Sequence, residues 1–494
     1  MRTRVVPTAS GKKAIQVVSK SYGKLTVHKH IGTFSGIEEK LQLLRKAQDF
    51  ITETTGQMSM LDVLSTFRPS DIAVSENRPL FVFNLLSKVY DKLGLGIYPD
   101  SLVRDLIIAR VYLPASKRDI VEILSDSFGR DYALKTVYRH LKKAMANGLK
   151  DSFQKALISF ARNELRDSLR LVFYDVTTLY FESNIKTNLK DFGFSKDHRS
   201  TDTQVVVGLV VGKDGFPLYF DVFQGNTFEG NTFVPVIKNI QHLLGNADLV
   251  VIADAAMISK DNIEKLSKEK IGFVVGARLA NLPQSLIDSI SSKLTRADGQ
   301  IIVESYRNQR LICQYSQKRA AKDKSDRLKQ IAKAEAAISN PSRITSRFRF
   351  VKTEGQTISL NQNLVNKAQK LEGIKGYLTN TNIPEQTVID RYHDLWKIEK
   401  SFRITKSDLE ARPIFHRLDE TIKAHLVIVF AGLAISKYLE IKTNMSIHKI
   451  LKLAGKVLTH KVTNTKTGEV AYVETTIENP TLKEEINFLK SLEH

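Results

Sequence analysis

The sequence predicts an α/β fold in which three strands in a meander precede a helix, a strand, a second helix and a further strand. The first three strands are the apolar segments at residues 169–181, 203–212 and 216–225. The last two of these flank Lys-Asp-Gly at residues 213–215, which is typical of a hairpin turn. A doubly wound sheet would alternate strand and helix from its first strand, so this order favours another α/β architecture.

That order is the chain order of a ribonuclease H-like catalytic core, whose first part we expect at residues 161–278. Two strand-like segments at residues 301–316 and 347–360, with a basic helical segment between them, interrupt the core. They predict a mainly β, basic insertion over residues 279–387. The second part of the core is then expected at residues 388–440 as two helices, the first running without a break from about Val388.

The termini carry shorter patterns. A β-hairpin around Tyr22-Gly23 at residues 13–34, followed by helices, is expected in the N-terminal region, residues 1–100. Residues 441–494 are expected to form a small mixed tail.

Residues 101–160 have the pattern of packed short helices, with Ser116 as an N-cap. In the third of these helices Leu134, Val137 and Leu141 are expected to face a core. Lys135, Arg139, Lys142 and Lys143 then face outward, which suits a helix-turn-helix DNA-binding region. An ordinary basic helical hairpin is the alternative interpretation.

Composition narrows the classes of function. The 494 residues contain 74 Lys and Arg against 53 Asp and Glu, a formal charge of +21, which favours a polyanionic partner such as DNA. The single cysteine, Cys313, excludes internal disulfides and a cysteine-cluster zinc site, and the histidines have no ligand spacing. Apolar runs such as Leu426–Ile435 are about half as long as a bilayer requires, and no apolar run follows the basic N-terminus, so neither a membrane partner nor a signal peptide is expected.

Two aspartates follow apolar runs in the predicted core. Asp175 comes after Leu-Val-Phe-Tyr and Asp254 after Leu-Val-Val-Ile-Ala, so both are expected at the ends of neighbouring strands. Carboxylates that converge there can hold a pair of divalent ions for phosphodiester chemistry. Each aspartate alone could equally be a cap or a turn residue. Asp221 is a weaker candidate for the second acid, and Glu182 is expected to line the site without binding metal.

The helix expected after the insertion supplies a third acid, Glu399. Tyr392, Leu395, Trp396, Glu399, Phe402 and Arg403 share one broad face at helical spacing, and Lys406 lies about two turns beyond Glu399. A face that mixes apolar residues with a carboxylate and cations is unlike a plain core stripe. A salt-bridged surface helix remains the alternative. Trp396 either stacks on an unpaired base or belongs to the core.

The pattern Tyr392-x2-Leu395-x3-Glu399-x6-Lys406 resembles the Tyr-Arg-Glu-Lys signature of bacterial insertion-sequence DDE transposases. YDVTTLYFES and VVIADAAMIS resemble the blocks that carry the first and second aspartates of that group. The resemblance covers residues 100–440 and implies a ribonuclease H-like core with two Mg²⁺ ions, or Mn²⁺ as a substitute, held by Asp175, Asp254 and Glu399. It also implies DNA-phosphate contacts from Tyr392 and Lys406, with Arg403 and Trp396 nearby.

The same resemblance implies the partners. They are double-stranded DNA, namely the terminal repeats of the element and a target, and a second copy of the chain in a synaptic homodimer. The expected location is the bacterial cytoplasm, at the nucleoid.

The sequence departs from the signature at Leu395, where arginine is usual, and at Ala255-Ala256, where Arg-Gly is common. A different ribonuclease H-like nuclease, such as a junction resolvase, and a catalytically inactive DNA-binding repressor therefore stay as alternatives.

Overall fold

The computed structural model describes residues 1–8, 12–21, 24–55, 72–194, 201–245, 248–257, 259–339, 348–354, 357–465 and 468–492. The chain forms two compact units. The smaller unit contains Met1–Arg78 and Leu458–Thr476, and the larger unit contains Pro79–Val457 and Ile477–His494. All three predicted catalytic acids belong to the larger unit.

The smaller unit contains two antiparallel sheets and a helix. The predicted hairpin forms as β2 (Lys13–Ser21) and β3 (Lys24–Phe34), and β1 (Arg2–Pro7) pairs with β2, so the hairpin is part of a three-stranded sheet. Its expected turn, Tyr22-Gly23, lies outside the described residues. Helix α1 (Ile37–Thr55) packs its Ala47 with the buried residues Ile15 and Val17 of β2. The second sheet has the order β16 (Val470–Glu474), β15 (Thr459–Asn464), β4 (Ile72–Arg78).

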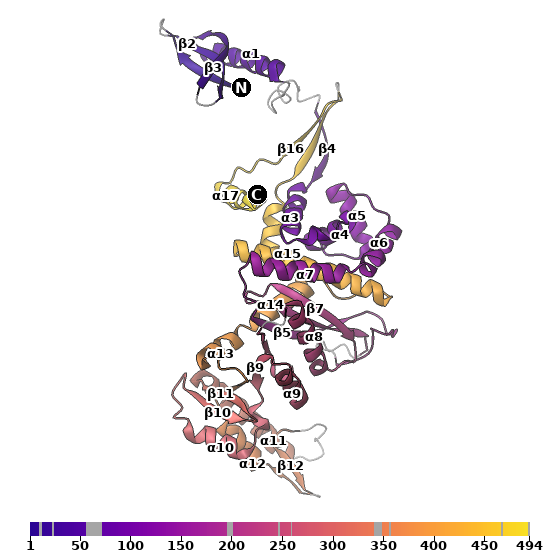
Figure 1. Ribbon diagram of the computed structural model, residues 1–494, viewed down its shortest axis with the longest axis vertical. Helices are drawn as coiled ribbons and strands as arrows, with labels where there is room; N and C mark the ends of the chain where they lie inside the picture. The colour runs from indigo at the N-terminus through magenta and orange to yellow at the C-terminus, as the bar shows by residue number, and fades with distance from the viewer. Residues whose placement is uncertain are drawn as a thin grey trace. The chain divides into compact units, whose positions relative to one another are not determined.

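The larger unit begins with five helices, α3 (Leu80–Lys92), α4 (Ser101–Tyr112), α5 (Lys117–Phe128), α6 (Leu134–Ala146) and α7 (Leu149–Asn163) (Figure 1). The predicted cap of α5 is confirmed, because the Ser116 hydroxyl accepts a hydrogen bond from the Asp119 amide. On α6, Val137 and Leu141 are buried as expected. Leu134 is 36 % exposed, and the expectation that it faces the core was wrong because it begins the helix, before the turn that packs.

An eight-stranded sheet forms the centre of the larger unit, with the order β10-β11-β14-β9-β8-β5-β6-β7. Five of its strands form the predicted catalytic core: β5 (Leu171–Tyr180), β6 (Gln204–Val211), β7 (Pro217–Gln224), β8 (Val250–Ala253) and β9 (Gly272–Ala277). β5, β6 and β7 form the antiparallel meander, and β8 and β9 then add in parallel on the other side of β5. This order confirms the ribonuclease H-like core.

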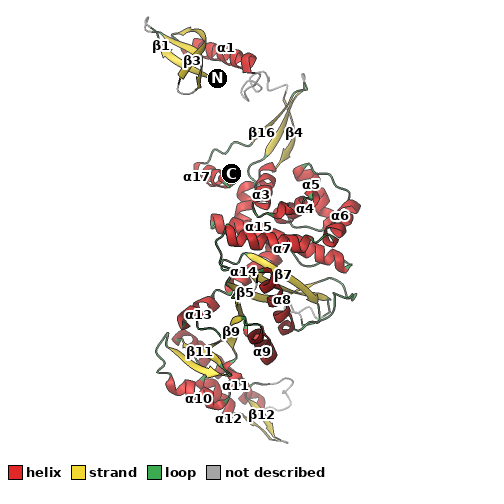
Figure 2. Cartoon of the chain, viewed as in Figure 1, coloured by secondary structure: helices red, strands yellow, loops and turns green. Residues whose placement is uncertain are grey.

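Helices cover both faces of this sheet. On one face α8 (Glu229–Leu243) packs its Phe233 against Tyr174 of β5, with ring centroids 5.4 Å apart. On the other face α15 (Asp419–Thr443) packs its Phe430 against Phe220 of β7 at 4.7 Å. One hydrophobic core joins the sheet, these helices and α3–α7. Figure 2 distinguishes the helices of this unit, in red, from its strands, in yellow.

The expected insertion continues the central sheet. Its strands β10 (Ile301–Tyr306), β11 (Gln309–Tyr315) and β14 (Ile374–Thr379) extend the sheet beyond β9. Only β12 (Val351–Glu354) and β13 (Thr357–Leu360) pair apart from it. Three helices, α10 (Gln284–Lys293), α11 (Gln317–Ser339) and α12 (Gln362–Lys370), hold more of the described residues than these strands do. The expectation of a mainly β insertion was therefore wrong, because long polar helices separate its strands.

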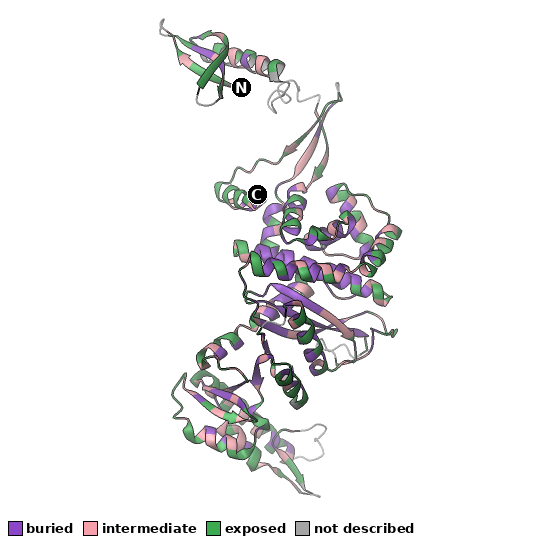
Figure 3. Cartoon of the chain, in the orientation of Figure 1, coloured by how far each residue is buried: buried purple, intermediate pink, exposed green. Residues whose placement is uncertain are grey.

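Helix α15 is the one helix among the described residues that is long and apolar enough to cross a membrane. Its most apolar window is 94 % buried inside the protein, which is how the central helix of a large core behaves (Figure 3). After it, α16 (Ile447–Ala454) and α17 (Pro480–Ser491) complete the larger unit.

The single helix expected from Val388 is broken. Helix α13 (Glu385–His393) ends before α14 (Trp396–Arg403), and a π-helical turn (Ile404–Asp408) follows. At the break the Leu395 amide bonds to the Tyr392 carbonyl, three residues back. Hydrogen bonds that reach three residues back also join Lys397 to Asp394 and Ile398 to Leu395, so the regular four-residue pattern is interrupted between α13 and α14.

Candidate active site

One row of side chains crosses the central sheet and carries the candidate acids. The register of the parallel strands pairs Tyr174 of β5 with Ala253 at the end of β8, so Asp175 and Asp254 are the residues that directly follow this pair. Ala253 in turn pairs with Val275 of β9, so Gly276 follows in the same row. Gly276 pairs with Tyr377 of β14. Because neighbouring strands lie about 4.8 Å apart, Asp175 and Asp254 are close neighbours on one face.

The two aspartates differ in their place on the strands. Asp254 directly follows β8, as expected. Asp175 lies in the middle of β5, and the expectation that it ends its strand was wrong. β5 continues to Tyr180 because its second half still pairs with β6, whereas its pairing with β8 ends at Tyr174. Asp175 is thus the point at which β5 loses one neighbour, and its side chain is only half-buried.

Tyr392 connects the second aspartate to helix α13. Its hydroxyl donates a hydrogen bond to Asp254 Oδ1 at 3.3 Å, and its side chain is 8 % exposed. Its ring meets the Tyr377 ring edge-on, with centroids 5.0 Å apart. Burial raises the pKa of Tyr392, and the negative charge of Asp254 raises it further. The hydroxyl therefore stays protonated at neutral pH and acts as a hydrogen-bond donor.

A lysine completes this side of the site. Lys375 of β14 places its Nζ 4.7 Å from the centroid of the Tyr392 ring. Burial lowers the pKa of Lys375, as does the charge of Arg319, while the charge of Asp254 acts in the opposite direction. The Asp254 carboxylate thus has one hydroxyl donor and one nearby cation.

Glu399 lies on the same face as Asp175. Thr177, two residues after Asp175 on β5, and Phe402, one turn after Glu399 on α14, line the same small cavity. This contact places α14 over the Asp175 face of the sheet. The Glu399 side chain is exposed, and its charge contributes to the raised pKa of Tyr392.

The three acids are the kind of donor set that suits a divalent metal ion. Carboxylate oxygens are the ligands that hard ions prefer, and two of the acids are neighbours in one row of the sheet. Among the described residues, no group of three His, Cys, Asp or Glu side chains is close enough together to hold a metal ion. The donors suit the ions, and Glu399 has to approach the two aspartates to complete a shared site.

Other predicted residues have these positions. Trp396 is 55 % exposed, so the alternative of a core role was wrong. Arg403 is exposed on α14, and Lys406 is half-buried in the π-helical turn. Lys135 and Arg139 are exposed on α6, as expected.

Two further acids of the core, Glu182 and Asp221, have these positions. Glu182 is exposed just after β5. Asp221 lies on β7, the edge strand, and pairs with Lys150 of α7 at 2.7 Å. That ion pair gives Asp221 a structural partner, which disfavours it as the second acid.

Sequence reasoning missed Gly276, Lys375 and Tyr377. Their role depends on contacts with Tyr392 and Asp254, and contacts between residues so distant in the sequence cannot be predicted from the sequence pattern. The one available signal was Gly276 itself, because a glycine inside a strand often marks a close approach by another group.

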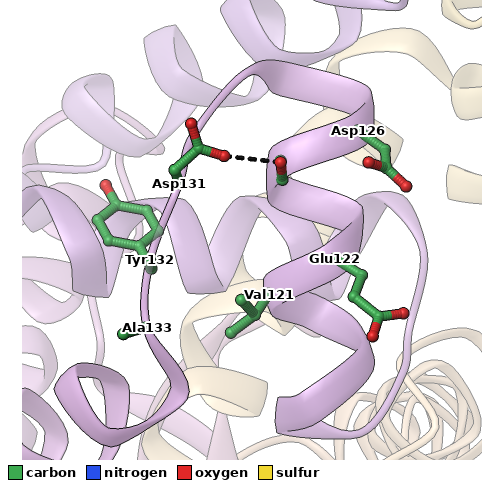
Figure 4. A pocket seen from close by; sticks show the side chains of 7 residues that line it. Val121, Glu122, Asp126, Asp131, Tyr132 and Ala133 are labelled. Carbon is green, nitrogen blue, oxygen red and sulfur yellow. Dashed lines mark hydrogen bonds between the residues drawn. The ribbon is translucent and has the colours of Figure 1, made fainter.

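An acidic pocket on the helical region contains none of the predicted site residues. It lies between α5 and the segment that leads to α6, and Glu122, Asp126 and Asp131 are among its lining residues (Figure 4). Asp131 accepts a hydrogen bond from the Ser125 hydroxyl at 2.6 Å. Its negative charge disfavours DNA at this place, so any DNA contact from α6 belongs to the exposed cations of that helix.

Comparison with known proteins gives the family. The model of the transposase DDE domain matches residues 168–435, more than half of the chain. No curated protein matches. Among solved structures, the piggyBac transposase synaptic complex with hairpin DNA is similar with a TM-score of 0.40 and 9 % identity, over 77 % of this chain and 79 % of that chain. The family model runs from the start of β5 into α15 and includes all three acids, and the protein therefore belongs to the transposase DDE domain family, metal-dependent enzymes that cleave transposon DNA ends and join them.

Proposed function

We propose that Asp175, Asp254 and Glu399 are the catalytic, metal-binding acids of this transposase. The observation that carries the proposal is the register of the central sheet, which makes Asp175 and Asp254 neighbours in one row with α14 over the same face. The donor set favours Mg²⁺, with Mn²⁺ as a substitute. A pair of such ions supplies activation of the attacking oxygen and charge stabilisation at the leaving oxygen.

The protein's own residues orient these acids. Tyr392 holds the Asp254 carboxylate through its hydroxyl, and Gly276 leaves the space in which that hydroxyl lies. Because Tyr392 is buried, we assign it the role of positioning Asp254 in preference to a direct contact with DNA. Lys375 balances part of the negative charge around Asp254 until DNA and metal bind.

DNA contacts are proposed for exposed or half-buried residues around the acids. Trp396 and Arg403 are exposed on α14, and Lys406 follows in the π-helical turn. A half-buried lysine suits a phosphate contact, because less side-chain freedom is lost when it binds. Lys135 and Arg139 present a cationic face on α6 for a helix-turn-helix contact with terminal-repeat DNA.

The substrates follow from this chemistry. Two transposon ends must be cut and brought to one target, so a synaptic homodimer is the proposed active form. The resemblance of the Tyr392–Lys406 segment to the Tyr-Arg-Glu-Lys signature favours a bacterial insertion sequence as the source. Action in the cytoplasm at the nucleoid would follow.

The test is cleavage of DNA that carries the element's own terminal repeats, with Asp175→Asn and Glu399→Gln compared to Glu182→Gln. Both site variants should lose cleavage in Mg²⁺ by at least about 100-fold while they still bind end DNA. Glu182→Gln, which removes an exposed carboxylate near Asp175 in the chain, should cleave normally.

Each alternative predicts another pattern. A catalytically inactive repressor binds the ends and cuts nothing, even as the natural sequence. A junction resolvase cuts branched DNA without joining a 3′-hydroxyl to target. Normal cleavage by Asp175→Asn or Glu399→Gln would show that the triad is wrongly assigned.

A further inference from the structure

A second cationic site lies in the larger unit, away from the row of acids. A cavity of about 200 Å³ is enclosed by α4, the start of α5, α6, the segment at residues 410–416 and α15. Arg110, Lys117, Arg118, Arg412, His416 and His425 are among its lining residues. None of the three acids, nor Tyr392 or Lys375, lines it.

Three of the lining side chains are buried and have donors or ring nitrogens with no partner. Arg110, Lys117 and His425 are 3 %, 3 % and 4 % exposed. Among the described residues, Arg110 Nε, Lys117 Nζ and His425 Nδ1 have no hydrogen-bond partner. Buried polar groups without partners are costly and rare. Arg110 Nε and Lys117 Nζ are donors and call for a ligand that accepts hydrogen bonds. His425 Nε2 donates to the Ala411 carbonyl, so His425 Nδ1 is an acceptor, which the hydroxyl of a protonated phosphate can satisfy.

The side chains are nevertheless held in place. Arg110 donates through Nη2 to the Ala115 carbonyl at 2.6 Å, and His425 Nε2 lies 3.3 Å from the Ala411 carbonyl. The His416 ring stacks at a tilt on the His425 ring, with centroids 5.3 Å apart. Such fixed side chains form a site that exists before the ligand arrives.

The charge around the cavity is positive. Glu410 is the one carboxylate among its lining residues, against Arg110, Lys117, Arg118 and Arg412. Burial lowers the pKa of Lys117 well below its usual value and that of Arg110 to about 10. Burial is the main cause of both shifts, and an anion bound in the cavity would oppose it by favouring the charged forms of these side chains.

The start of α5 adds to this field. Lys117 is the first residue of this twelve-residue helix, and Ser116 is its cap. The first amides of a helix have no acceptor within the helix and attract anions. The Ser116 hydroxyl already accepts from the Asp119 amide, and the Asp119 carboxylate in the first turn offsets part of this field. The unpartnered buried side chains therefore carry most of the preference for an anion.

We propose that this cavity binds a phosphate group. Its size admits one phosphate with part of the molecule that carries it, and its donors match phosphate oxygens. The phosphate belongs either to a DNA strand or to a small free phosphate. The assignment does not depend on which acids carry out catalysis, because no residue is shared between the two sites.

The first experiment measures thermal unfolding of the full chain with inorganic phosphate at constant ionic strength. Phosphate should raise the Tm of the natural protein by at least about 1 °C at ten times its Kd. Lys117→Met should keep or raise the Tm without phosphate, because it removes an unpaired buried cation, and should lose the response. Arg118→Gln, at the exposed rim of the cavity, should weaken the response. Lys155→Met, which removes an exposed lysine on α7, should leave it unchanged.

The second experiment separates the two sources of phosphate. If the ligand is DNA, Lys117→Met should weaken binding of end DNA by about tenfold or more at fixed salt, and inorganic phosphate should compete with DNA for the natural protein only. If the ligand is a free phosphate, the Tm response is lost in Lys117→Met while its DNA affinity equals that of Lys155→Met. The proposal is overturned if natural protein and Lys117→Met respond equally to phosphate and bind DNA equally.

Discussion

At the scale of single residues, the site depends on a glycine that touches no ligand. A Cβ added to Gly276 would lie 2.4 Å from the Tyr392 hydroxyl oxygen and 3.1 Å from Tyr392 Cζ. Tyr392 can donate to Asp254 only because this side of β9 has no side chain at residue 276. The missing side chain at residue 276 therefore permits the hydrogen bond that orients the second aspartate.

Gly276→Ala should lower cleavage by about tenfold or more, because Tyr392 must move away from Asp254, and small displacements of this kind are costly. The free energy of unfolding should fall by about 1–3 kcal/mol from the overpacked contact. Cleavage rates and denaturant unfolding measure the two effects.

A double variant supplies the control for this prediction. Tyr392→Phe removes the hydroxyl that the new Cβ would meet, so Gly276→Ala should cost less stability in the Tyr392→Phe background than alone. Equal costs in both backgrounds would mean that residue 276 does not act through Tyr392. Gly36→Ala, where a Cβ would meet nothing within 4 Å, is the neutral comparison.

His416 gives a residue-scale prediction for pH. Burial lowers its pKa to about 3, and the charges of Lys117 and Arg110 act in the same direction. The pKa of this histidine in the unfolded chain is about 6.5. Between pH 6.5 and the folded value of about 3, the unfolded chain binds the proton and the folded chain does not. The free energy of unfolding therefore falls as the pH falls through this interval. From pH 7 to pH 5 this group should remove roughly 2 kcal/mol of the free energy of unfolding.

Urea unfolding in phosphate-free buffer at pH 7 and pH 5 measures this effect. His416→Gln should lose less stability over this interval than the natural protein. His448→Gln, which removes an exposed histidine, should lose as much as the natural protein does. If His416→Gln and the natural protein lose the same amount, His416 is protonated in the folded state and the account of its burial is wrong.

At the scale of elements, the lysines of α11 form a stripe. Lys318, Lys322, Lys329 and Lys333 are exposed and lie at positions i, i+4, i+11 and i+15, which share one side of a helix. Arg327 of the same helix is instead held by Glu372 at 2.6 Å in a nearly buried ion pair. Four lysines of α11 thus form a surface stripe, whereas Arg327 makes a structural contact.

Changing the four stripe lysines to glutamine should flatten the dependence of log affinity for DNA on log salt, by about 0.9 for each lysine that contacts a phosphate. The four changes to arginine keep the charge and should keep the slope. Titration of fluorescent duplex DNA at several salt concentrations measures both. A slope that the glutamine variant leaves unchanged would place the DNA on another surface.

The elements also show what sequence can and cannot predict. Strands β5–β9 were predictable because each is an apolar run bounded by turn or helix signals, and α11 because its polar pattern is long. The pairing of β11 with β14 and of β14 with β9 was not, because a strand's own pattern does not name its neighbour. The break near Leu395 was hidden because Tyr392–Phe402 keeps a helical spacing through it.

At the scale of the whole molecule, the larger unit is built around one core that joins helices α3–α7, the sheet and α15. The acids come from segments 79 and 145 residues apart in the sequence, counted from 175 to 254 and from 254 to 399. The two aspartates were visible in the sequence because each follows an apolar run, and Glu399 because its helical segment resembles the transposase signature. Gly276, Lys375 and Tyr377 were invisible because only the folded sheet brings them to Tyr392.

The central claim is that Asp254 binds the divalent metal that cleavage requires. The most direct measurement is the cleavage rate of Asp254→Cys on end DNA in Mg²⁺ and in Mn²⁺, beside Glu182→Cys as the control. A thiolate is a poor ligand for Mg²⁺ and a better one for the softer Mn²⁺. If Asp254 binds the metal, Asp254→Cys should not cleave in Mg²⁺ and should cleave measurably in Mn²⁺, with Glu182→Cys active in both. Cleavage by Asp254→Cys in Mg²⁺ at the rate of the natural protein would contradict this claim.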